Sequence, residues 1–206
     1  MSSQQPIAIL GAGGHAKVVI GALRAAGETI TAAFDDDESR AGMLVSGIPV
    51  KGSITRAREL GLRRAVIAVG DNDARRRIAE SFDFEWVQVR HPTAWIDPTS
   101  RIGVGTVIFA HAVIQGDSTI GDHAIVNTGA TVDHDCDVAA FAHLGPGVSL
   151  GGGVSIGESA LVGVGASIKP HLSIGEKATI GCGAAVITNV AAGIRAAGVP
   201  ARPLSD

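Results

Sequence analysis

Aromatic side chains are almost missing from this sequence. They make up 3% of the 206 residues and tyrosine is absent, although 46% of the residues are hydrophobic and 28 are glycine. A core with so few rings must be built from valine, isoleucine, leucine and alanine, packed at the usual density of protein interiors. This composition favours a thin, regular architecture over a bulky globular one.

The sequence also has few cysteines, a small net charge and no long hydrophobic run. The two cysteines, Cys136 and Cys182, have neither CxxC nor zinc spacing, and the net charge of −3 comes without a basic stripe. The first residues show no basic segment leading into a long apolar run, and no window reaches eighteen apolar residues. We therefore expect a cytoplasmic protein with no nucleic-acid partner, no membrane span and no targeting segment.

A period of six residues dominates the sequence from Ile96 onward. Sixteen positions spaced by six, from Ile96 to Val186, are all isoleucine, valine or leucine, and the positions four residues after each are small or apolar. This period fits neither an amphipathic helix nor a hairpin, and it is typical of a hexapeptide β-helix with one strand and one corner per hexad. Three hexads per coil predict about five coils of a triangular prism within residues 91–206, with residues 90–100 as the hinge leading into it.

Residues 1–90 follow a different pattern, in which apolar strands alternate with segments of helical spacing. This alternation predicts a small Rossmann-like α/β domain with a parallel sheet. Strands are expected at "IAIL", "TITAAF", "RAVIAVG" (64–70) and "EWVQV" (85–89), and helices at "HAKVVIGALRAAG", near 53–60 and at "NDARRRIAESF" (72–82).

A glycine-rich turn joins the first strand to the first helix. The segment "GAGGHA", from residue 11, fits the G-x-G-x-x-G/A pattern, and Asp35 and Asp36 follow the second strand. Backbone N–H groups in such a turn can approach a pyrophosphate, and the acid can reach a ribose hydroxyl. About ninety residues hold one mononucleotide half rather than two, so we expect a nucleoside diphosphate linked to something shorter than NAD. A tight turn without a ligand is the alternative.

The stretch "NTGATVDHDCDVAAFAHLGPG" (127–147) contains a histidine between two acids. Cys136 falls on an inward position and is interpreted as a core residue, so Asp133, His134 and Asp135 form an outward corner segment. A carboxylate that accepts a hydrogen bond from one ring nitrogen fixes the tautomer, which leaves the other nitrogen to take a proton. A plain corner histidine is the alternative. The other histidines interpreted as polar corner or hinge residues are His91, His111, His123 and His171.

The combination of motifs resembles one family. The segments "ILGAGGHAKVV", "FDDD", "AVGDNDARR", "NTGATVDHDC" and "GVPARP" are similar to those of the NeuD/PglD-like hexapeptide-repeat family of sialic-acid O-acetyltransferases and nucleotide-amino-sugar N-acetyltransferases. The resemblance covers nearly the whole chain. It implies a left-handed parallel β-helix and a homotrimer with acetyl-CoA, the co-substrate, in a groove between neighbouring β-helices. It also implies a nucleotide sugar held by the N-terminal domain, and no metal.

The resemblance also implies roles for individual residues. His134 matches the general base and Asp135 the acid that orients it, where relatives often have glutamate. Asn127 matches a sugar contact, His143 a position near acetyl-CoA, and the N–H of Gly152 the donor to the thioester oxygen. The further matches are Val164, Gly181 and Cys182 for acetyl-CoA, and Gly13, Gly14, His15, Asp35 and Asp36 for the nucleotide sugar.

We therefore expect an enzyme of glycan biosynthesis that transfers acetyl directly to the amino group of a nucleotide-linked 4-amino-4,6-dideoxy sugar, with His134 as base. The first alternative is O-acetylation of a sialic-acid-like or other sugar. A metal-dependent γ-class carbonic anhydrase is the second, but its H-x4-H spacing is missing among the histidines of the β-helix. A non-catalytic nucleotide-sugar sensor on a trimeric scaffold is the third. The sequence does not distinguish UDP, GDP and dTDP.

Overall fold

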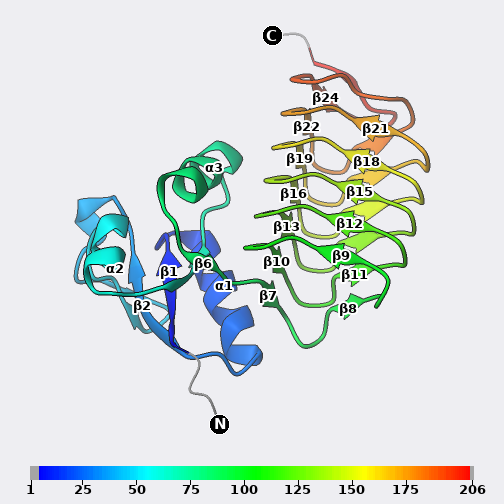
Figure 1. Cartoon of the computed structure of the whole chain (residues 1–206). Coiled ribbons are helices and arrows are strands. Elements are labelled where there is room, and N and C mark those ends of the chain that lie inside the picture. The colour runs from blue at the N-terminus through cyan, green and yellow to red at the C-terminus, as the bar shows by residue number, and fades with distance from the viewer. Residues whose placement is uncertain (1–4, 205–206) are drawn as a thin grey trace. The chain divides into compact units, whose positions relative to one another are not determined.

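The computed structural model describes residues 5–204 and divides the chain between Pro92 and Thr93 into two compact units. Both predicted architectures are present, because the first unit is an α/β unit with a parallel sheet and the second is a parallel β-helix (Figure 1). Within the described residues, no helix has the length and apolar character needed to cross a bilayer.

The first unit is built on a sheet of four parallel strands in the order β2-β1-β5-β6. Its strands are short; β1 and most of β2 and β5 are buried, whereas the edge strand β6 is exposed or half-buried. A separate antiparallel pair, β3-β4, follows a 3₁₀ turn at Glu38–Arg40. The elements are β1 (Ile7–Leu10), α1 (Gly14–Ala25), β2 (Ile30–Phe34), β3 (Leu44–Val45), β4 (Ile48–Pro49), α2 (Ile54–Glu59), β5 (Arg64–Ile67), α3 (Asn72–Ser81), β6 (Glu85–Trp86) and β7 (Val89–Arg90).

The strand order of this sheet reverses between β1 and β5. The chain moves from β1 outward to β2, then returns to the other side of β1 with β5 and β6. In open parallel sheets, ligands bind at such a switch point, outside the carboxyl ends of the strands. The glycine turn after β1 and the loop after β5 both lie at this edge.

Three faces form the second unit, and each strand pairs with the strand one coil later, as Val113 pairs with Thr131. The first face contains β8 (Trp95–Ile96), β11 (Val113–Ile114), β14 (Thr131–Val132), β17 (Ser149–Leu150), β20 (Ser167–Ile168) and β23 (Ala185–Val186). The second contains β9 (Arg101–Ile102), β12 (Thr119–Ile120), β15 (Asp137–Val138), β18 (Ser155–Ile156) and β21 (Ser173–Ile174). The third contains β10 (Val107–Ile108), β13 (Ile125–Val126), β16 (His143–Leu144), β19 (Leu161–Val162), β22 (Thr179–Ile180), β24 (Arg195–Ala197) and β25 (Arg202–Pro203).

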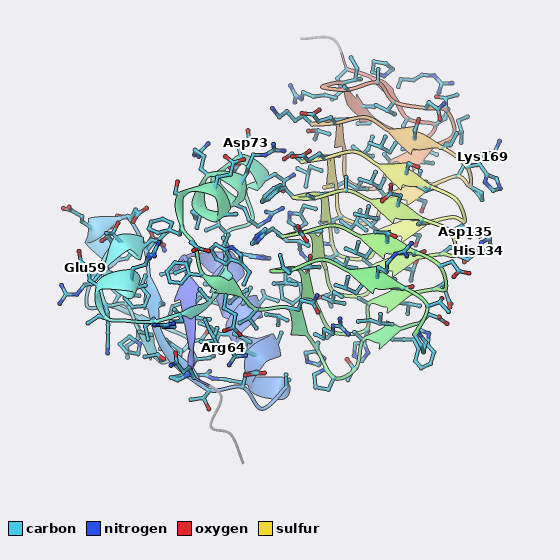
Figure 2. All side chains as sticks on the ribbon, in the orientation of Figure 1. Glu59, Arg64, Asp73, His134, Asp135 and Lys169 are labelled. Carbon is cyan, nitrogen blue, oxygen red and sulfur yellow. The ribbon has the colours of Figure 1, made fainter. Side chains whose placement is uncertain are left out.

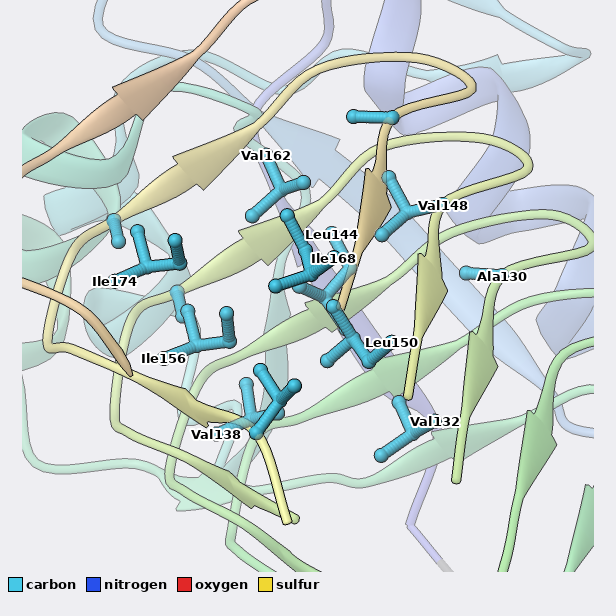
Figure 3. Packing of buried hydrophobic residues seen from close by; sticks show 14 of the residues in the cluster. Ala130, Val132, Val138, Leu144, Val148, Leu150, Ile156, Val162, Ile168 and Ile174 are labelled. Carbon is cyan, nitrogen blue, oxygen red and sulfur yellow. The ribbon is translucent and has the colours of Figure 1, made fainter. Parts of the chain in front are cut away.

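The aliphatic positions of the six-residue period point into the prism, as predicted. Every one of them from Ile108 to Val186 is at most 3% exposed, and they stack into ladders along the axis (Figure 3). The small residues four positions later, such as Ala130 and Ala160, are also buried and fill the space between the ladders. This alternation of large and small side chains explains how a core almost without aromatics reaches normal packing density.

The corners of the β-helix repeat as strictly as the core. A left-handed backbone conformation, with φ between 52° and 68°, recurs at every sixth residue from Gly105 to Gly183. Two sets of corners carry residues that the sequence analysis singled out. We call the turns between the first and second faces the histidine corner (residues 133–136, 151–154 and 169–172). The turns between the third and first faces form the asparagine corner (residues 127–130, 145–148, 163–166 and 181–184).

Three expectations need correction. The first face stacks six strands rather than the five coils expected, because the coiling continues through β23 to β24. The hinge expected over residues 90–100 is shorter, since Trp95 and Ile96 already pair with Val113 and Ile114. The strand expected over residues 85–89 is interrupted, so that β6 and β7 are separate elements.

Candidate functional site

His134 and Asp135 form a hydrogen-bonded pair at the histidine corner. They follow β14, and the distance between His134 Nδ1 and Asp135 Oδ2 is 2.7 Å. An ionised carboxylate only accepts hydrogen bonds, so Nδ1 carries the proton and Nε2 keeps a free lone pair. The side chains are 61% and 66% exposed. Figure 2 shows the pair on one edge of the β-helix, on the same edge as Lys169.

The backbone at this corner holds the two side chains together. Asp135 occupies the left-handed position of its hexad, with φ of 58°, a conformation that aspartate tolerates better than most residues. Asp133 Oδ1 accepts the His134 N–H at 2.9 Å, which ties the start of the turn. Hydrogen bonds to the carboxylates of Asp133 and Asp135 therefore hold His134 in place within this segment.

The two carboxylates raise the pKa of His134 above its ordinary value. The hydrogen bond that Asp135 accepts from the ring is the largest cause, and the negative charge of Asp133 adds to it, while partial desolvation acts in the opposite direction. A raised pKa makes Nε2 a stronger base once the ring is neutral.

Gly152 lies one coil above His134 and directly against its ring. A Cβ atom at Gly152 would lie 2.7 Å from His134 Cε1 and 2.8 Å from Nε2. Within residues 5–204, the Gly152 N–H donates no hydrogen bond to a protein acceptor. A proton acceptor and an unused backbone donor therefore adjoin each other at this corner.

The other predicted acetyl-CoA and sugar residues lie at or beside the asparagine corner. Asn127 Oδ1 accepts the Thr128 N–H at 2.8 Å, which leaves its Nδ2 to donate to His143 Nε2 at 3.2 Å. Val164 is 52% exposed and Cys182 is exposed, and both follow strands of the third face, with Gly181 next to Cys182. Asn127 and His143 thus form a side-chain hydrogen bond between this corner and strand β16.

One chain does not bring these two groups together. His134, Asp135 and Gly152 follow strands of the first face, whereas Asn127, Val164 and Cys182 follow strands of the third. A full face of the prism separates the two corners.

Cys136 is a core residue, as expected. It is 2% exposed, its Sγ contacts the Gly151 carbonyl oxygen at 3.3 Å, and burial raises the pKa of its thiol, which disfavours the nucleophilic thiolate. Among the described residues, no three histidine, cysteine, aspartate or glutamate side chains gather as metal ligands would.

The glycine turn at the carboxyl end of β1 leaves its outer side open. Gly11 has φ of 112°, and a Cβ there would lie 2.8 Å from Val69 Cγ2, so only glycine fits. A Cβ at Gly13 or Gly14 would instead meet nothing within 4 Å. The twelve-residue helix α1 starts at Gly14 without a capping side chain, so its N-terminal N–H groups are suited to an anion.

Asp35 and Asp36 each hold a backbone group of this unit. Asp35 Oδ2 accepts the Ala12 N–H at 2.6 Å, which clamps the glycine turn to the end of β2. Asp36 Oδ1 accepts the Ile54 N–H at 2.9 Å, at the start of α2. A carboxylate has about four acceptor sites, so both retain capacity for a ligand. His15 packs beside Gly70, whose Cβ would lie 3.9 Å from that of His15.

Arg75 is a structural residue of this edge that sequence reasoning missed. Its side chain is 1% exposed and donates to the carbonyls of Val69 and Gly70, each at 3.2 Å, and to Asn72 Oδ1 at 2.8 Å. Burial lowers its pKa to about 10, so it stays charged at neutral pH. The sequence did carry a signal for the burial of Arg75, because helical spacing places it on the same helix face as the apolar residues Ile78 and Phe82.

Replacing Arg75 by methionine is expected to lower the free energy of unfolding by about 1–3 kcal/mol, because buried carbonyls lose their donors. Urea titration followed by circular dichroism measures the change. Arg77→Met, on the exposed side of the same helix, should change it by less than about 0.5 kcal/mol. Equal losses in the two variants would contradict the structural role of Arg75.

Comparisons with known proteins show the family and the fold. The family model of the PglD N-terminal domain matches residues 6–82. The perosamine N-acetyltransferase of Caulobacter crescentus, solved with CoA and GDP-perosamine as a variant with one histidine replaced by asparagine, is 44% identical, with 99% of each chain covered and a TM-score of 0.93. The acetyltransferase domain of PglB from Neisseria gonorrhoeae, solved with acetyl-CoA, is 38% identical, with 98% of this chain and 100% of that one covered and a TM-score of 0.91.

Curated relatives match over a shorter stretch. The UDP-N-acetylbacillosamine N-acetyltransferase of Bacillus subtilis is 38% identical over 110 residues, which cover 50% of this chain and 51% of that protein. An uncharacterised mimivirus protein is 33% identical over 108 residues, or 52% of this chain and 22% of the viral protein. The chain thus spans about half or less of the curated relatives, but the full length of the solved acetyltransferases. It belongs to the PglD-like hexapeptide-repeat family of nucleotide-sugar N-acetyltransferases.

Proposed function

We propose that this protein transfers acetyl from acetyl-CoA to the amino group of a nucleotide-linked amino sugar of the 4-amino-4,6-dideoxy type. The observation that carries the proposal is the His134–Asp135 pair beside the unused N–H of Gly152. Two solved relatives of the same length bind CoA with GDP-perosamine or acetyl-CoA, which supports both co-substrates.

The chemistry follows from the free lone pair on His134 Nε2. The sugar ammonium first loses one proton to solvent. The neutral amine then attacks the thioester carbonyl, and Nε2 takes a second proton from nitrogen as the C–N bond forms. Negative charge develops on the thioester oxygen, where a fixed N–H such as that of Gly152 stabilises it; losing one such donor typically costs about 2.7–4 kcal/mol. The C–S bond then breaks, and the proton on His134 passes to the sulfur of CoA. The net reaction converts an ammonium and a thioester into an amide, a thiol and one released proton.

The nucleotide is proposed to bind at the carboxyl edge of the first unit. The N–H groups of Gly13 and Gly14, at the start of α1, suit a diphosphate, and the PglD-type family model covers this region. Asp35 and Asp36 stand at the end of the neighbouring strand, with acceptor capacity left for the nucleoside.

A homotrimer is part of the proposal, because the site is incomplete in one chain. The histidine corner carries the base, and the asparagine corner carries Asn127 and the exposed Val164, with His143 on the adjoining strand β16. Around a three-fold axis, the histidine corner of one copy can face the asparagine corner of the next. A substrate between two copies would then contact both groups.

Incubating the purified protein with acetyl-CoA and GDP-, UDP- and dTDP-linked 4-amino-4,6-dideoxy sugars tests the proposal. We expect thiol release and the gain of one acetyl group on the sugar nitrogen for at least one of them. The matching 4-hydroxy sugars distinguish O-acetylation. Nucleotide-sugar binding without any acetyl transfer would favour a sensor and overturn the proposal.

The Asp135→Asn variant tests how the pair sets the pH dependence. The base acts only when neutral, so kcat/KM rises as the pH increases through the pKa of His134, and the hydrogen bond to Asp135 and the charge of Asp133 raise that pKa and move the rise to higher pH. Asparagine tolerates the left-handed backbone but removes the charge and the strongest cause of the shift. The rise is therefore expected at lower pH, with a lower plateau. An unmoved pH profile would contradict the role of Asp135.

A further inference from the structure

Three consecutive glycines, residues 151–153, begin the turn of the histidine corner that lies one coil above His134. Gly152 faces the ring of His134. Gly153 faces a second histidine, because a Cβ there would lie 2.5 Å from His171 Nδ1 and 3.1 Å from its Cε1. The ring of His134 therefore reaches the glycine turn from the coil below, and the ring of His171 reaches it from the coil above.

The backbone holds His171 over this turn while its side chain stays available. His171 belongs to the turn at residues 169–172, which Lys169 marks in Figure 2. Its N–H donates to the Gly152 carbonyl oxygen at 2.9 Å. The residue is exposed, and in the described part of the chain its side chain forms no hydrogen bond or ion pair. Nδ1, Cε1 and Cγ are the ring atoms nearest to Gly153, so Nε2 lies on the outer side of the ring, where a ligand can reach it.

The CoA end of the thioester is expected on the same side of the turn as His171. The acetyl-CoA residues Val164 and Cys182 follow β19 and β22, in later coils than Gly152, which follows β17. Copies related by a three-fold axis along the prism keep equal residues at equal heights, so CoA extends from Gly152 toward the C-terminal coils. The sulfur joins the acetyl group to that part of CoA. This inference rests on the proposed function, because it takes the thioester oxygen to lie at the Gly152 N–H.

We propose that the ring of His171 donates a hydrogen bond to the sulfur of acetyl-CoA as the C–S bond breaks. The electron pair of that bond moves onto sulfur, and a donor beside it stabilises the negative charge until the proton on His134 arrives. A neutral imidazole keeps one N–H, which Nε2 can carry, so this role needs no change of protonation state. The site then has two donors with separate tasks, the Gly152 N–H for the carbonyl oxygen and His171 for the sulfur.

Two substitutions separate the donor from the fold. Asparagine accepts the left-handed backbone of residue 171, with φ of 59°, but is too short to reach the turn below. Glutamine places an amide NH₂ near the position of the imidazole Nε2, and the unbranched Lys177 already adopts this backbone conformation at another corner, with φ of 55°. In single-turnover experiments with saturating acetyl-CoA, we expect His171→Asn to slow acetyl transfer roughly tenfold, and His171→Gln by no more than about threefold.

The melting temperature and the Kd for acetyl-CoA, measured by calorimetry, should stay near the wild-type values in both variants. His111→Asn is the matched control, because it makes the same substitution at an exposed histidine of another corner, and it should keep the wild-type rate. A weaker affinity for acetyl-CoA with an unchanged rate would make His171 a binding contact only. Equal losses of rate in His171→Asn and His171→Gln would overturn the role as a donor.

The leaving group gives an independent readout that a structural role would not change. In the selenoester analogue of acetyl-CoA, the selenolate that leaves is a weaker base than the thiolate and needs less stabilisation. The ratio of the wild-type rate to the His171→Asn rate should therefore fall from about ten with the thioester toward one with the selenoester. The same ratio with both substrates would overturn the contact with sulfur.

The outcomes separate this role from the proposed function on which it rests. A wild-type protein that acetylates an amino sugar, together with a His171→Asn variant that is equally fast on the thioester, retains the proposed function and loses only the role of His171. A wild-type protein that transfers no acetyl group to any of the amino sugars loses both.

Discussion

The His134→Ala variant is expected to turn over roughly 10²–10⁴-fold more slowly than the wild-type protein, the usual range for loss of a general base. The variant keeps the Gly152 N–H and the binding surfaces, so KM for both substrates should change little. Its thermal stability should also be nearly unchanged, because the ring is 61% exposed and lies outside the core. The measurement is steady-state thiol release from acetyl-CoA with the amino sugar at saturation.

The pH profile of this variant carries a second readout. Both enzymes need a neutral amine, but only the wild type also needs a neutral His134, so the deficit of His134→Ala should be smallest at low pH and grow as the pH rises through the pKa of His134. His111→Asn is the matched control, because His111 is an exposed histidine at another β-helix corner, and asparagine accepts its left-handed φ of 60°. A His134→Ala enzyme with unchanged kcat would remove His134 from the mechanism.

The β-helix could be predicted because one local rule repeats along it. An aliphatic residue every six positions places side chains inside a short-stranded coil, and no other regular structure shares that period. The corner conformations were harder to predict. His123, Phe141 and Lys177 adopt left-handed φ values, which bulky residues rarely do, because the repeat imposes the corner on whatever residue occupies it. At one such corner the rings of His123 and Phe141 stack with their centroids 5.3 Å apart, and this contact offsets part of the backbone strain. His123 is therefore buried, although the sequence predicted an ordinary polar corner residue.

The site was predictable where its partners are sequence neighbours. His134 and Asp135 are adjacent, and the register alone placed both outside the core. The contacts of Asp35 and Asp36 could not be predicted in the same way, since their backbone partners Ala12 and Ile54 are distant in sequence. Register likewise showed which residues face outward, but only the order of the faces shows that His134 and Asn127 occupy different corners.

The Gly152→Ala variant is expected to lose roughly 10²–10³-fold in kcat while folding normally. The new methyl group would overlap the end of the His134 ring, at 2.7–2.8 Å, and that exposed side chain can swing away at little cost to folding. The movement separates His134 from Asp135 and from the position proposed for the thioester at the Gly152 N–H, and small misplacements of this kind cost about two orders of magnitude. The melting temperature should stay near that of the wild-type protein.

Two comparisons show whether the loss acts through the histidine. Gly116 occupies the same position one coil below His134, and a Cβ there would touch Thr99 Oγ1 at 3.2 Å rather than the ring, so Gly116→Ala should retain activity. In the double variant with His134→Ala, the Gly152→Ala substitution should cost almost nothing further, because the ring that it displaces is already absent. Fully additive losses would instead mean that the methyl group blocks acetyl-CoA or the oxyanion donor directly. Gly152 would then be a residue of the thioester site alone, and the close packing of His134 against it would have no part in positioning the base.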